Sequence, residues 1–414
     1  MSKTFRIIIF FLKLPIYIFC IFLSFFLLII NLFYKVKTYE VDVATFGHFF
    51  NDFNLTNIYS KTNKIKVIGS IVGLKHYHNK YILSVVRKEF VTSFLFKYLD
   101  FINRKMPWAK FVTIPSFRKE SSFDLDGLVF SNPSLIFKFN DNEDQYCSNF
   151  LENKGIKKND KFILLNLRDN YFYNQIFNYK ADNLNITRNQ IRIENCIKPL
   201  EYLSSKGFKI IRWGRFRKKI HVPSTINFYD FSLDETIPHI LDVWLAKNCS
   251  FSIGTDSGPD TIVGNFNNLM CILGMWPLYY SRSFFKCITL PADARWLDSK
   301  KNLNLREMCE FHSNENYIDE LKLKNIEFIK NSDEQIFDVI NQTFQIYEGK
   351  YSFSPELLKK QEKYWSSFLQ WDINSEKNYP QKKIQKRFMG FKHPSALIAD
   401  TFLKEKKEDW FDIN

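Results

Sequence analysis

Residues 249–260 read Cys-Ser-Phe-Ser-Ile-Gly-Thr-Asp-Ser-Gly-Pro-Asp, an apolar run followed directly by a turn with two glycines. Pro259 is suited to the first turn of a helix, where its missing N–H costs nothing. Four of the 13 glycines of the chain fall between positions 254 and 274. Glycines that cluster in a glycine-poor chain answer a local geometric need. The stretch therefore predicts a buried strand, a tight turn and a helix.

This turn is a candidate binding site for an anionic ligand. In an open parallel sheet, ligands bind where strands end and helices begin, and the start of a helix favours phosphate. We expect Thr255, Asp256, Ser257 and Gly258 to line the site. Ser257 offers a hydroxyl, Gly258 lets the backbone approach closely, and Asp256 is placed to orient a ribose or sugar hydroxyl. The alternative is an ordinary strand–helix turn without a ligand.

The flanking sequence repeats the alternation of strand and helix. Apolar runs predict strands over 162–167, 208–213, 226–231, 249–253, 269–273 and 326–329. Helices are predicted over 188–205, 235–247 and from Ser332 or Asp333 to Tyr347. Such alternation is typical of a parallel, doubly wound α/β sheet. Upstream, we expect strands over 39–45 and 64–71, a helix beginning near Asn51 or Asp52, and one long helix over 81–103.

The N-terminal region has the length and composition of a membrane helix. Residues Leu14–Phe33 contain no charged side chain over 20 positions, which is enough to cross a hydrocarbon core. A cleaved signal peptide is a poorer interpretation, because the apolar run is long and no small-residue cleavage site follows it. The same pattern also fits a buried core helix, or a helix lying in the membrane interface.

We predict four parts: a membrane anchor helix (1–36), an N-terminal Rossmann-like acceptor domain (37–155), a C-terminal Rossmann-like nucleotide-sugar domain (156–348) and a helical tail (349–414).

Charge and cysteine usage narrow the partners and the compartment. The formal net charge of +14 suits an anionic membrane or a phosphate-bearing substrate. Without a zinc-finger spacing or an aromatic-basic RNA motif, nucleic acid is not an expected partner. The seven cysteines are scattered and never in Cys-x-x-Cys spacing, which favours a reducing compartment. We therefore expect no metal and no cofactor, and a catalytic part on the cytoplasmic side.

Several ordered motifs carry a resemblance to a known family. The segment Cys249–Leu278, with its Ser-Gly turn and the later Trp276-Pro277-Leu278, resembles the donor-site motif of a family of mostly uncharacterised bacterial glycosyltransferases of the GT-B type. This family is distantly similar to heptosyltransferases of surface-polysaccharide synthesis. Further matching pieces, in the same order as in the family, are Phe46-Gly47-His48, Leu165–Tyr171, Arg188-Asn189 with Gly207 to Gly214, and Asn331-Ser332. Asn267-Asn268, where a proline is common, and residues 105–150 depart from the pattern.

The resemblance implies two Rossmann-like domains facing a cleft and a metal-independent transfer from a nucleoside-diphosphate sugar to a hydroxyl. The acceptor that it implies is a saccharide or a lipid-linked molecule. Arg168 and Arg212, each at the end of a strand, are the candidates for contact with the diphosphate. His48 and Asp52, just after the first strand, are the candidates for the base that activates the acceptor.

Two further functions stay open on the sequence. The pair Asp124 and Asp126 has the spacing of a divalent-metal site and suggests a metal-dependent (GT-A) glycosyltransferase. The chain also fits a catalytically inactive, membrane-held scaffold that keeps the fold. A dinucleotide oxidoreductase is disfavoured, because no Gly-x-Gly-x-x-Gly follows an early strand.

Overall fold

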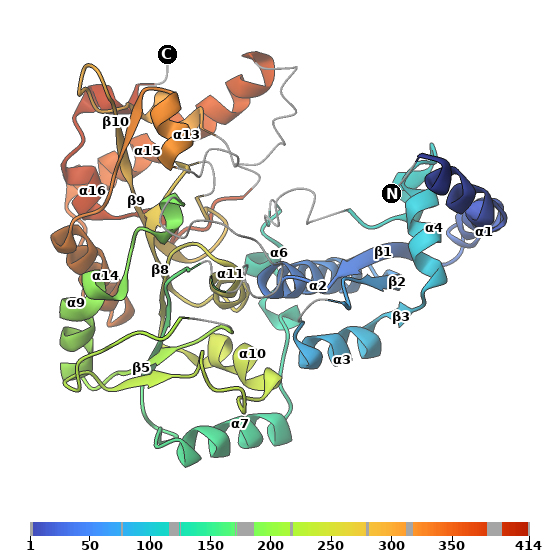
Figure 1. The fold of residues 1–414 in the computed structure, drawn as a ribbon, viewed down its shortest axis with the longest axis horizontal. Coiled ribbons are helices and arrows are strands. Elements are labelled where there is room, and N and C mark those ends of the chain that lie inside the picture. The colour runs from blue at the N-terminus through green and yellow to red at the C-terminus, as the bar shows by residue number, and fades with distance from the viewer. Residues whose placement is uncertain are drawn as a thin grey trace. The chain divides into compact units, whose positions relative to one another are not determined.

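The computed structural model describes residues 3–75, 78–115, 124, 126–169, 171, 186–215, 218–278, 281–311, 318–378 and 391–412 (Figure 1). The chain divides into two compact units, which are described separately. Unit 1 comprises residues 1–122 and 132–136, and unit 2 comprises residues 123–131 and 137–414. The predicted boundary at residue 155 therefore falls inside unit 2, as does the tail. The expected cleft between two domains stays a prediction.

Unit 1 is built on a parallel three-stranded sheet in the order β1-β2-β3, formed by β1 (Val36–Asp42), β2 (Lys66–Val72) and β3 (Val91–Thr92). Neighbouring residues of β1 point to opposite faces. Thr38 donates its hydroxyl hydrogen to Asp100 of α4 (Leu95–Asn103) at 2.7 Å. Tyr39, the next residue, bonds Thr56 of α2 (Phe46–Thr62). Hence α4 and α2 cover opposite faces of this sheet.

The predicted long helix over 81–103 is wrong. The structure has α3 (Lys80–Glu89), then strand β3, then α4. Val91 and Thr92 are β-branched residues that pair with Ile68 and Gly69 of β2, and this pairing outweighs helix propensity. The first helix of the sheet region also begins earlier than predicted, at Phe46, with Thr45 as an extended N-cap.

Two more short elements complete unit 1, and one long helix precedes its sheet. The N-terminal helix α1 runs from Lys3 to Ile30 with Pro15 inside it, and it packs beside α4 (Figure 1). Its segment Lys13–Ile30 is long and apolar enough to cross a membrane, with a mean hydropathy of 2.4. The short helix α5 (Ala109–Val112) contacts α1 and β1, and the 3-10 helix η1 (Pro133–Leu135) contacts α2.

Unit 2 contains a seven-stranded, wholly parallel sheet, which confirms the α/β class predicted from the sequence. The strand order is β12-β9-β8-β7-β4-β5-β6. The strands are β4 (Phe162–Asn166), β5 (Lys209–Arg212), β6 (Phe228–Asp230), β7 (Ser252–Gly254), β8 (Met270–Met275), β9 (Cys287–Pro291) and β12 (Leu397–Ile398). The chain builds outward from β4 to β6, then returns to β7 and builds outward on the other side, as a doubly wound sheet does.

Helices connect the strands of unit 2, and some of them contact the main sheet. They are α6 (Leu128–Ser131), α7 (Asp141–Asn153), η2 (Thr187–Asn189), α9 (Ile193–Ser205), α10 (His239–Asn248), α11 (Gly258–Asn265), α12 (Leu305–Cys309), α13 (Ile318–Leu323), α14 (Asp333–Tyr347), α15 (Pro355–Asn378), α16 (Asp400–Lys404) and η4 (Glu408–Phe411). Phe208 stacks edge-on against Phe251, Phe344 and Tyr347, and these rings fix α14 to the sheet.

The pairing of the last predicted strand and the packing of the tail both differ from what the sequence predicted. Strand β11 (Ile326–Ile329) is present, but it pairs antiparallel with β10 (Asp293–Trp296) outside the main sheet. In the tail, β12 extends the main sheet beside β9. Gln361 of α15 holds this strand by donating to the carbonyl of Ile398 at 2.5 Å and accepting its N–H at 3.1 Å. The tail is thus an integral part of unit 2.

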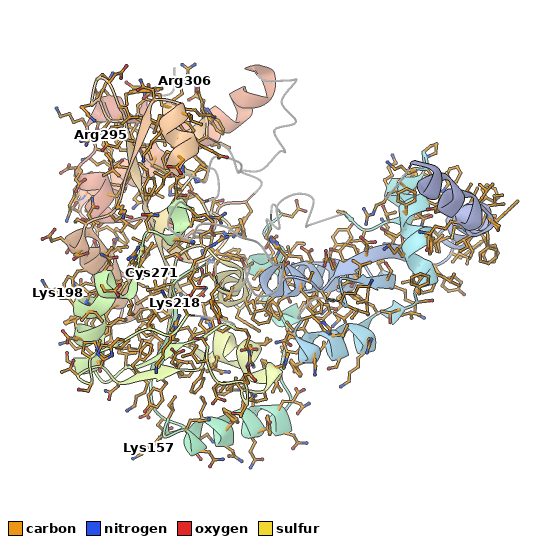
Figure 2. All side chains as sticks on the ribbon, viewed as in Figure 1. Lys157, Lys198, Lys218, Cys271, Arg295 and Arg306 are labelled. Carbon is orange, nitrogen blue, oxygen red and sulfur yellow. The ribbon has the colours of Figure 1, made fainter. Side chains whose placement is uncertain are left out.

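Basic side chains are spread over unit 2. Lys157, Lys198, Arg295 and Arg306 lie at separate places on its outside, whereas Cys271 of β8 is buried in its interior (Figure 2). A dispersed distribution is that of solvated surface charges. The excess of positive charge therefore does not by itself mark a site. Arginines of a candidate site have to be recognised by the residues that they contact.

Candidate functional site

The candidate site lies at the point where the sheet of unit 2 changes direction. Strands β4 and β7 are hydrogen-bonded neighbours, with Asn166 opposite Gly254, although β5 and β6 lie between them in the sequence. The crevice at the carboxyl ends of two such strands is where doubly wound folds bind ligands. The predicted turn, residues 255–258, follows β7 at this edge, and Arg168 follows β4.

The turn is held by side chains that face inward. The backbone N–H of Ser257 donates to the Asp260 carboxylate at 2.7 Å. Asn166 donates to the other oxygen of Asp260 at 3.0 Å and also to the Ser257 hydroxyl. A Cβ on Gly254 would lie 2.1 Å from the Asp260 carboxylate, so glycine is required there. The start of α11 is therefore already occupied by an acidic side chain of the chain itself.

Asp256 gathers arginines at this turn. Its side chain is 1% exposed, and it accepts from Arg282 Nε at 2.7 Å and from Arg188 Nη1 at 3.1 Å. Burial by itself raises the pKa of the Asp256 carboxyl, but Arg282 and Arg188, with a smaller effect from Arg168, outweigh it and hold the pKa below its usual value. Two guanidinium groups thus contact one buried carboxylate, and Arg168 lies near enough to affect its pKa.

Arg188 and Arg282 are functional candidates that the sequence reasoning did not select. Arg188 comes from η2, and Arg282 comes from the segment between β8 and β9. Their side chains are 15% and 13% exposed, so both are mostly buried yet reach the surface. Arg188 stood in a motif of the resemblance, which was a usable signal. Arg282 lies between two serines, and no local pattern distinguishes it.

Of the predicted donor-site residues, four belong to the turn and the start of α11, and Arg168 lies beside them. Thr255, Asp256 and Ser257 are buried and build the turn; the Thr255 hydroxyl, for example, accepts the backbone N–H of Arg168 at 2.8 Å. Gly258 is the first residue of α11. Arg168 is partly exposed and lies near Asp256. Their contacts with a ligand stay predictions.

Arg212 lies at the carboxyl end of β5 and is engaged within the protein. It is 4% exposed and donates to Asp230 at 2.9 Å and to the carbonyl of Lys218 at 2.8 Å. The Arg212 nitrogen that donates to Lys218, Nη2, also lies 3.7 Å from the carboxylate of Asp169. Arg212 therefore ties the ends of β4, β5 and β6 together, while its predicted contact with a diphosphate stays a prediction.

The two candidate bases, His48 and Asp52, belong to unit 1. They lie one turn apart on α2, where His48 is exposed and Asp52 is 2% exposed. Asp52 is close enough to Tyr39 to add to the effect of burial, and together they raise the pKa of the tyrosine well above its usual value. The structure therefore places His48 and Asp52 on the same helix of unit 1. The arginines that contact Asp256 belong to unit 2.

Asp124, the first residue of the acidic pair that suggested a metal-dependent enzyme, has a structural role. The two carboxylate oxygens of Asp124 accept the N–H groups of Leu128 and Val129 at 2.7 and 2.9 Å, at the start of α6. Burial raises the pKa of Asp124 to about 6. Within the described residues, no group of three or more His, Cys, Asp or Glu side chains is placed to hold a metal ion.

Solved structures with similar folds include two glycosyltransferases. A glycosyl transferase family 9 protein from Veillonella parvula is 13% identical, with a TM-score of 0.44, covering 76% of this chain and 97% of that one. The heptosyltransferase TibC, from enterotoxigenic E. coli, is 12% identical, with a TM-score of 0.35 and coverages of 76% and 77%.

A UDP-GlcNAc 2-epimerase from Methanocaldococcus jannaschii is 11% identical, with a TM-score of 0.28 and coverages of 62% and 66%. No protein-family model and no curated protein sequence matches the chain. The first two structures are of the kind that the sequence motifs resemble, and each similarity is one of fold. We therefore infer function from the residues of the chain itself.

Proposed function

We propose that this protein is a GT-B glycosyltransferase that moves a sugar from a nucleoside-diphosphate sugar to a hydroxyl acceptor. The observation that carries the proposal is the arginine cluster around Asp256 at the switch point between β4 and β7. The ordered sequence motifs, which resemble those of bacterial GT-B enzymes, point to the same segment. The solved structure of TibC holds ADP-D-β-D-heptose, a donor of the class that we propose here.

The cluster has the chemistry that a diphosphate requires. Asp256 fixes the guanidinium groups of Arg188 and Arg282 before a ligand arrives, so less side-chain entropy is lost on binding. Charge-assisted hydrogen bonds from arginine to phosphate are about twice as strong as neutral ones. Because Asp260 already occupies the start of α11, we assign the diphosphate to the arginines rather than to the helix end.

The same charges serve the chemical step. The acceptor oxygen attacks the anomeric carbon, the bond from that carbon to the diphosphate oxygen breaks, and the nucleoside diphosphate leaves with the bonding electron pair. Positive groups that are already in place stabilise the charge that develops on the leaving group. A base in unit 1 takes the proton of the acceptor. Of the two candidates, we favour His48, which is exposed, whereas Asp52 is buried near Tyr39.

We further propose that the transfer needs no metal ion. Arginines take the role that a divalent cation plays toward the diphosphate in metal-dependent enzymes. Asp124, one of the two acidic residues that suggested a metal site, accepts backbone hydrogen bonds from α6 with both carboxylate oxygens. This structural role of Asp124 supports the proposal of a transfer without a metal ion.

The acceptor that we propose is a saccharide or a lipid-linked molecule at a membrane, in surface-polysaccharide or glycolipid synthesis. The length and apolar character of α1 support an anchor in the membrane. The seven cysteines are free and buried, in keeping with a catalytic part on the cytoplasmic side. Nucleic acid is not among the proposed partners.

A nucleotide panel tests the donor site. The full chain in detergent is titrated with UDP, GDP, ADP and CDP, first by thermal shift and then by calorimetry. We expect selective binding of one nucleoside diphosphate, weaker binding of its monophosphate, and a loss of about tenfold or more in affinity for Arg282→Ala, Arg188→Ala and Arg168→Ala, from the roughly 1.5–3 kcal/mol of a hydrogen bond to a charged group.

Arg295→Ala is the matched control for this panel. Its guanidinium is paired with Glu327 at 2.7 Å in the β10–β11 pair and has no part in the proposed site. We expect this variant to bind the nucleotide like the unmodified chain. Folded protein that binds none of the four nucleotides, or site variants that bind as the control does, would contradict the donor-site assignment and favour the inactive scaffold.

A further inference from the structure

One face of α1 is packed against the rest of unit 1. Cys20, Ser24 and Leu27 are 1%, 0% and 6% exposed, and their spacing of four and three residues places them on one side of the helix. Cys20 forms a buried cluster with Leu99 and Ile102 of α4. The indole N–H of Trp108 donates to the Ser24 hydroxyl at 3.0 Å. The anchor helix is therefore docked on its own domain and is not a free tether.

Much of the remaining surface of α1 between Lys13 and Ile30 is exposed and apolar. Between Lys13 and Ile30 there is no charged residue after the first position, and only 17% of this segment is buried. Large side chains are open to the outside along it, namely Ile18, Phe19, Ile21, Phe22, Phe25, Phe26 and Ile29. At 1.5 Å per residue, the 18 residues of this segment extend about 27 Å.

This exposed surface continues onto the helices that hold α1. Phe94 and Leu95 at the start of α4, Phe101 within it and Phe111 on α5 are 71%, 49%, 53% and 52% exposed. These large apolar side chains stand close together in the sequence, on elements that contact α1, and they exceed what a soluble surface usually leaves open. We call these four residues, with the seven on α1, the apolar face of unit 1.

Basic side chains accompany the apolar face. Lys97, Lys105 and Lys110 are exposed or half-buried among its aromatic residues. The one acidic residue between positions 91 and 115 is Asp100, which is 3% exposed and neutralised by Arg104 at 2.7 Å. Exposed aromatic rings with interspersed lysines are typical of segments in the headgroup region of a bilayer, and the lysines favour anionic lipids.

We propose that unit 1 is itself a membrane-binding domain, in which α1 lies along the interface of an anionic bilayer, with α4 and α5 beside it in the headgroup region. This inference rests on the membrane attachment given under the proposed function and extends it from one helix to a face of the domain. Because α2 covers the opposite side of the sheet from α4, His48 and Asp52 lie on a helix away from the lipid. A lipid-linked acceptor thus meets a domain that is held directly at the membrane surface.

The test uses the seven native cysteines, all of which are buried, as a silent background for a single added thiol. Phe94→Cys and Phe101→Cys, labelled with the environment-sensitive dye NBD, report on α4, and Phe22→Cys reports on the exposed side of α1. Ser84→Cys, on the exposed surface of α3, is the control. Each full-length variant is reconstituted in vesicles of phosphatidylcholine with phosphatidylglycerol, with and without brominated lipid.

For a face that lies about 5–10 Å deep in the headgroup and acyl boundary, we expect brominated lipid to lower the emission of the labels at positions 94 and 101 roughly twofold. The label at position 84 should be unaffected by bromine and quenched by aqueous iodide.

Quenching at position 22 alone would overturn the inference and leave α1 as a simple anchor. Quenching at none of the three apolar positions would remove membrane attachment itself. Emission from positions 94 and 101 that is shifted to the blue but insensitive to bromine would mean that a second copy of the chain covers this face, and would also overturn the inference.

Discussion

Replacing Asp256 by Asn separates the charge of this residue from its shape. The amide keeps one oxygen that can accept from Arg282, but it removes the negative charge that Asp256 supplies to Arg188 and Arg282. Removing one partner of a buried ion pair costs about 3–5 kcal/mol, and the retained hydrogen bond places this variant near 3 kcal/mol. For a unit of this size, 1 kcal/mol lowers the melting temperature by roughly 2–4 °C, so we expect a fall of about 6–12 °C.

The pH dependence provides a second signature. The pKa of Asp256 in the folded chain is lowered, so its stabilising contribution is complete above the unfolded value of about 3.9 and is lost as the pH falls through the folded value. The gap in melting temperature between the unmodified chain and Asp256→Asn should therefore be the same at pH 7 and pH 5, and should begin to narrow below about pH 4. Intrinsic tryptophan fluorescence in one detergent measures both.

Asp242→Asn is the matched control. Asp242 is 4% exposed and is paired with one arginine, Arg215, at 2.9 Å. Burial outweighs this arginine and raises the pKa of Asp242 to about 6, so its contribution is present at low pH and is lost as the pH rises through that value. Because this contribution is already lost at pH 7, we expect Asp242→Asn to melt there no earlier than the unmodified chain, in contrast to Asp256→Asn. Equal losses for the two variants, or a gap at Asp256 that widens as the pH falls from 5 to 3, would refute the reasoning.

Three further predictions follow from single contacts. Gly254→Ala places a Cβ 2.1 Å from the Asp260 carboxylate and should cost about 1–3 kcal/mol by overpacking; a melting temperature equal to that of the unmodified chain would show that the turn adapts. Burial raises the pKa of Asp124 to about 6, so its contribution to stability is lost as the pH rises from the unfolded value through 6. Asp124→Asn should therefore make the melting temperature less dependent on pH between pH 4 and 6. An unchanged pH dependence would count against this. Added EDTA should leave nucleotide affinity unchanged in calorimetry, whereas a loss of tenfold, or about 1.4 kcal/mol, would restore a role for a metal ion.

Much of the sheet of unit 2 was predictable, because its central strands are continuous apolar runs. Residues 162–166 are buried throughout, as expected for a strand covered on both faces. The two missed strands lack such a signal: β9 ends in Pro291, and β12 has only two residues that are fixed by Gln361. The helix predicted over 81–103 failed because its apolar spacing continues across β3, and pairing with β2 is a long-range effect that periodicity does not encode.

The site was predictable only in part, for a related reason. The turn after β7 is contiguous in the sequence, so its glycines and its position between strand and helix identified it. The charges that it gathers come from Arg188 and Arg282, which lie 68 and 26 residues from Asp256. Asp256 itself suggested a contact with a sugar, since nothing local shows that its partners are arginines. Ion pairs across a doubly wound sheet become visible only when the strand order is known.

The central claim, that the chain transfers a sugar, is tested most directly by following the sugar. The full-length protein in vesicles receives a radiolabelled sugar on the nucleotide selected by the panel, together with a lipid extract as the source of acceptors. We predict label in the lipid or polysaccharide fraction, release of one nucleoside diphosphate for each sugar transferred, no effect of EDTA, and loss of transfer in Arg282→Ala. Tight binding of the nucleotide without any transfer to lipid, saccharide or water would contradict the claim and identify the chain as an inactive scaffold.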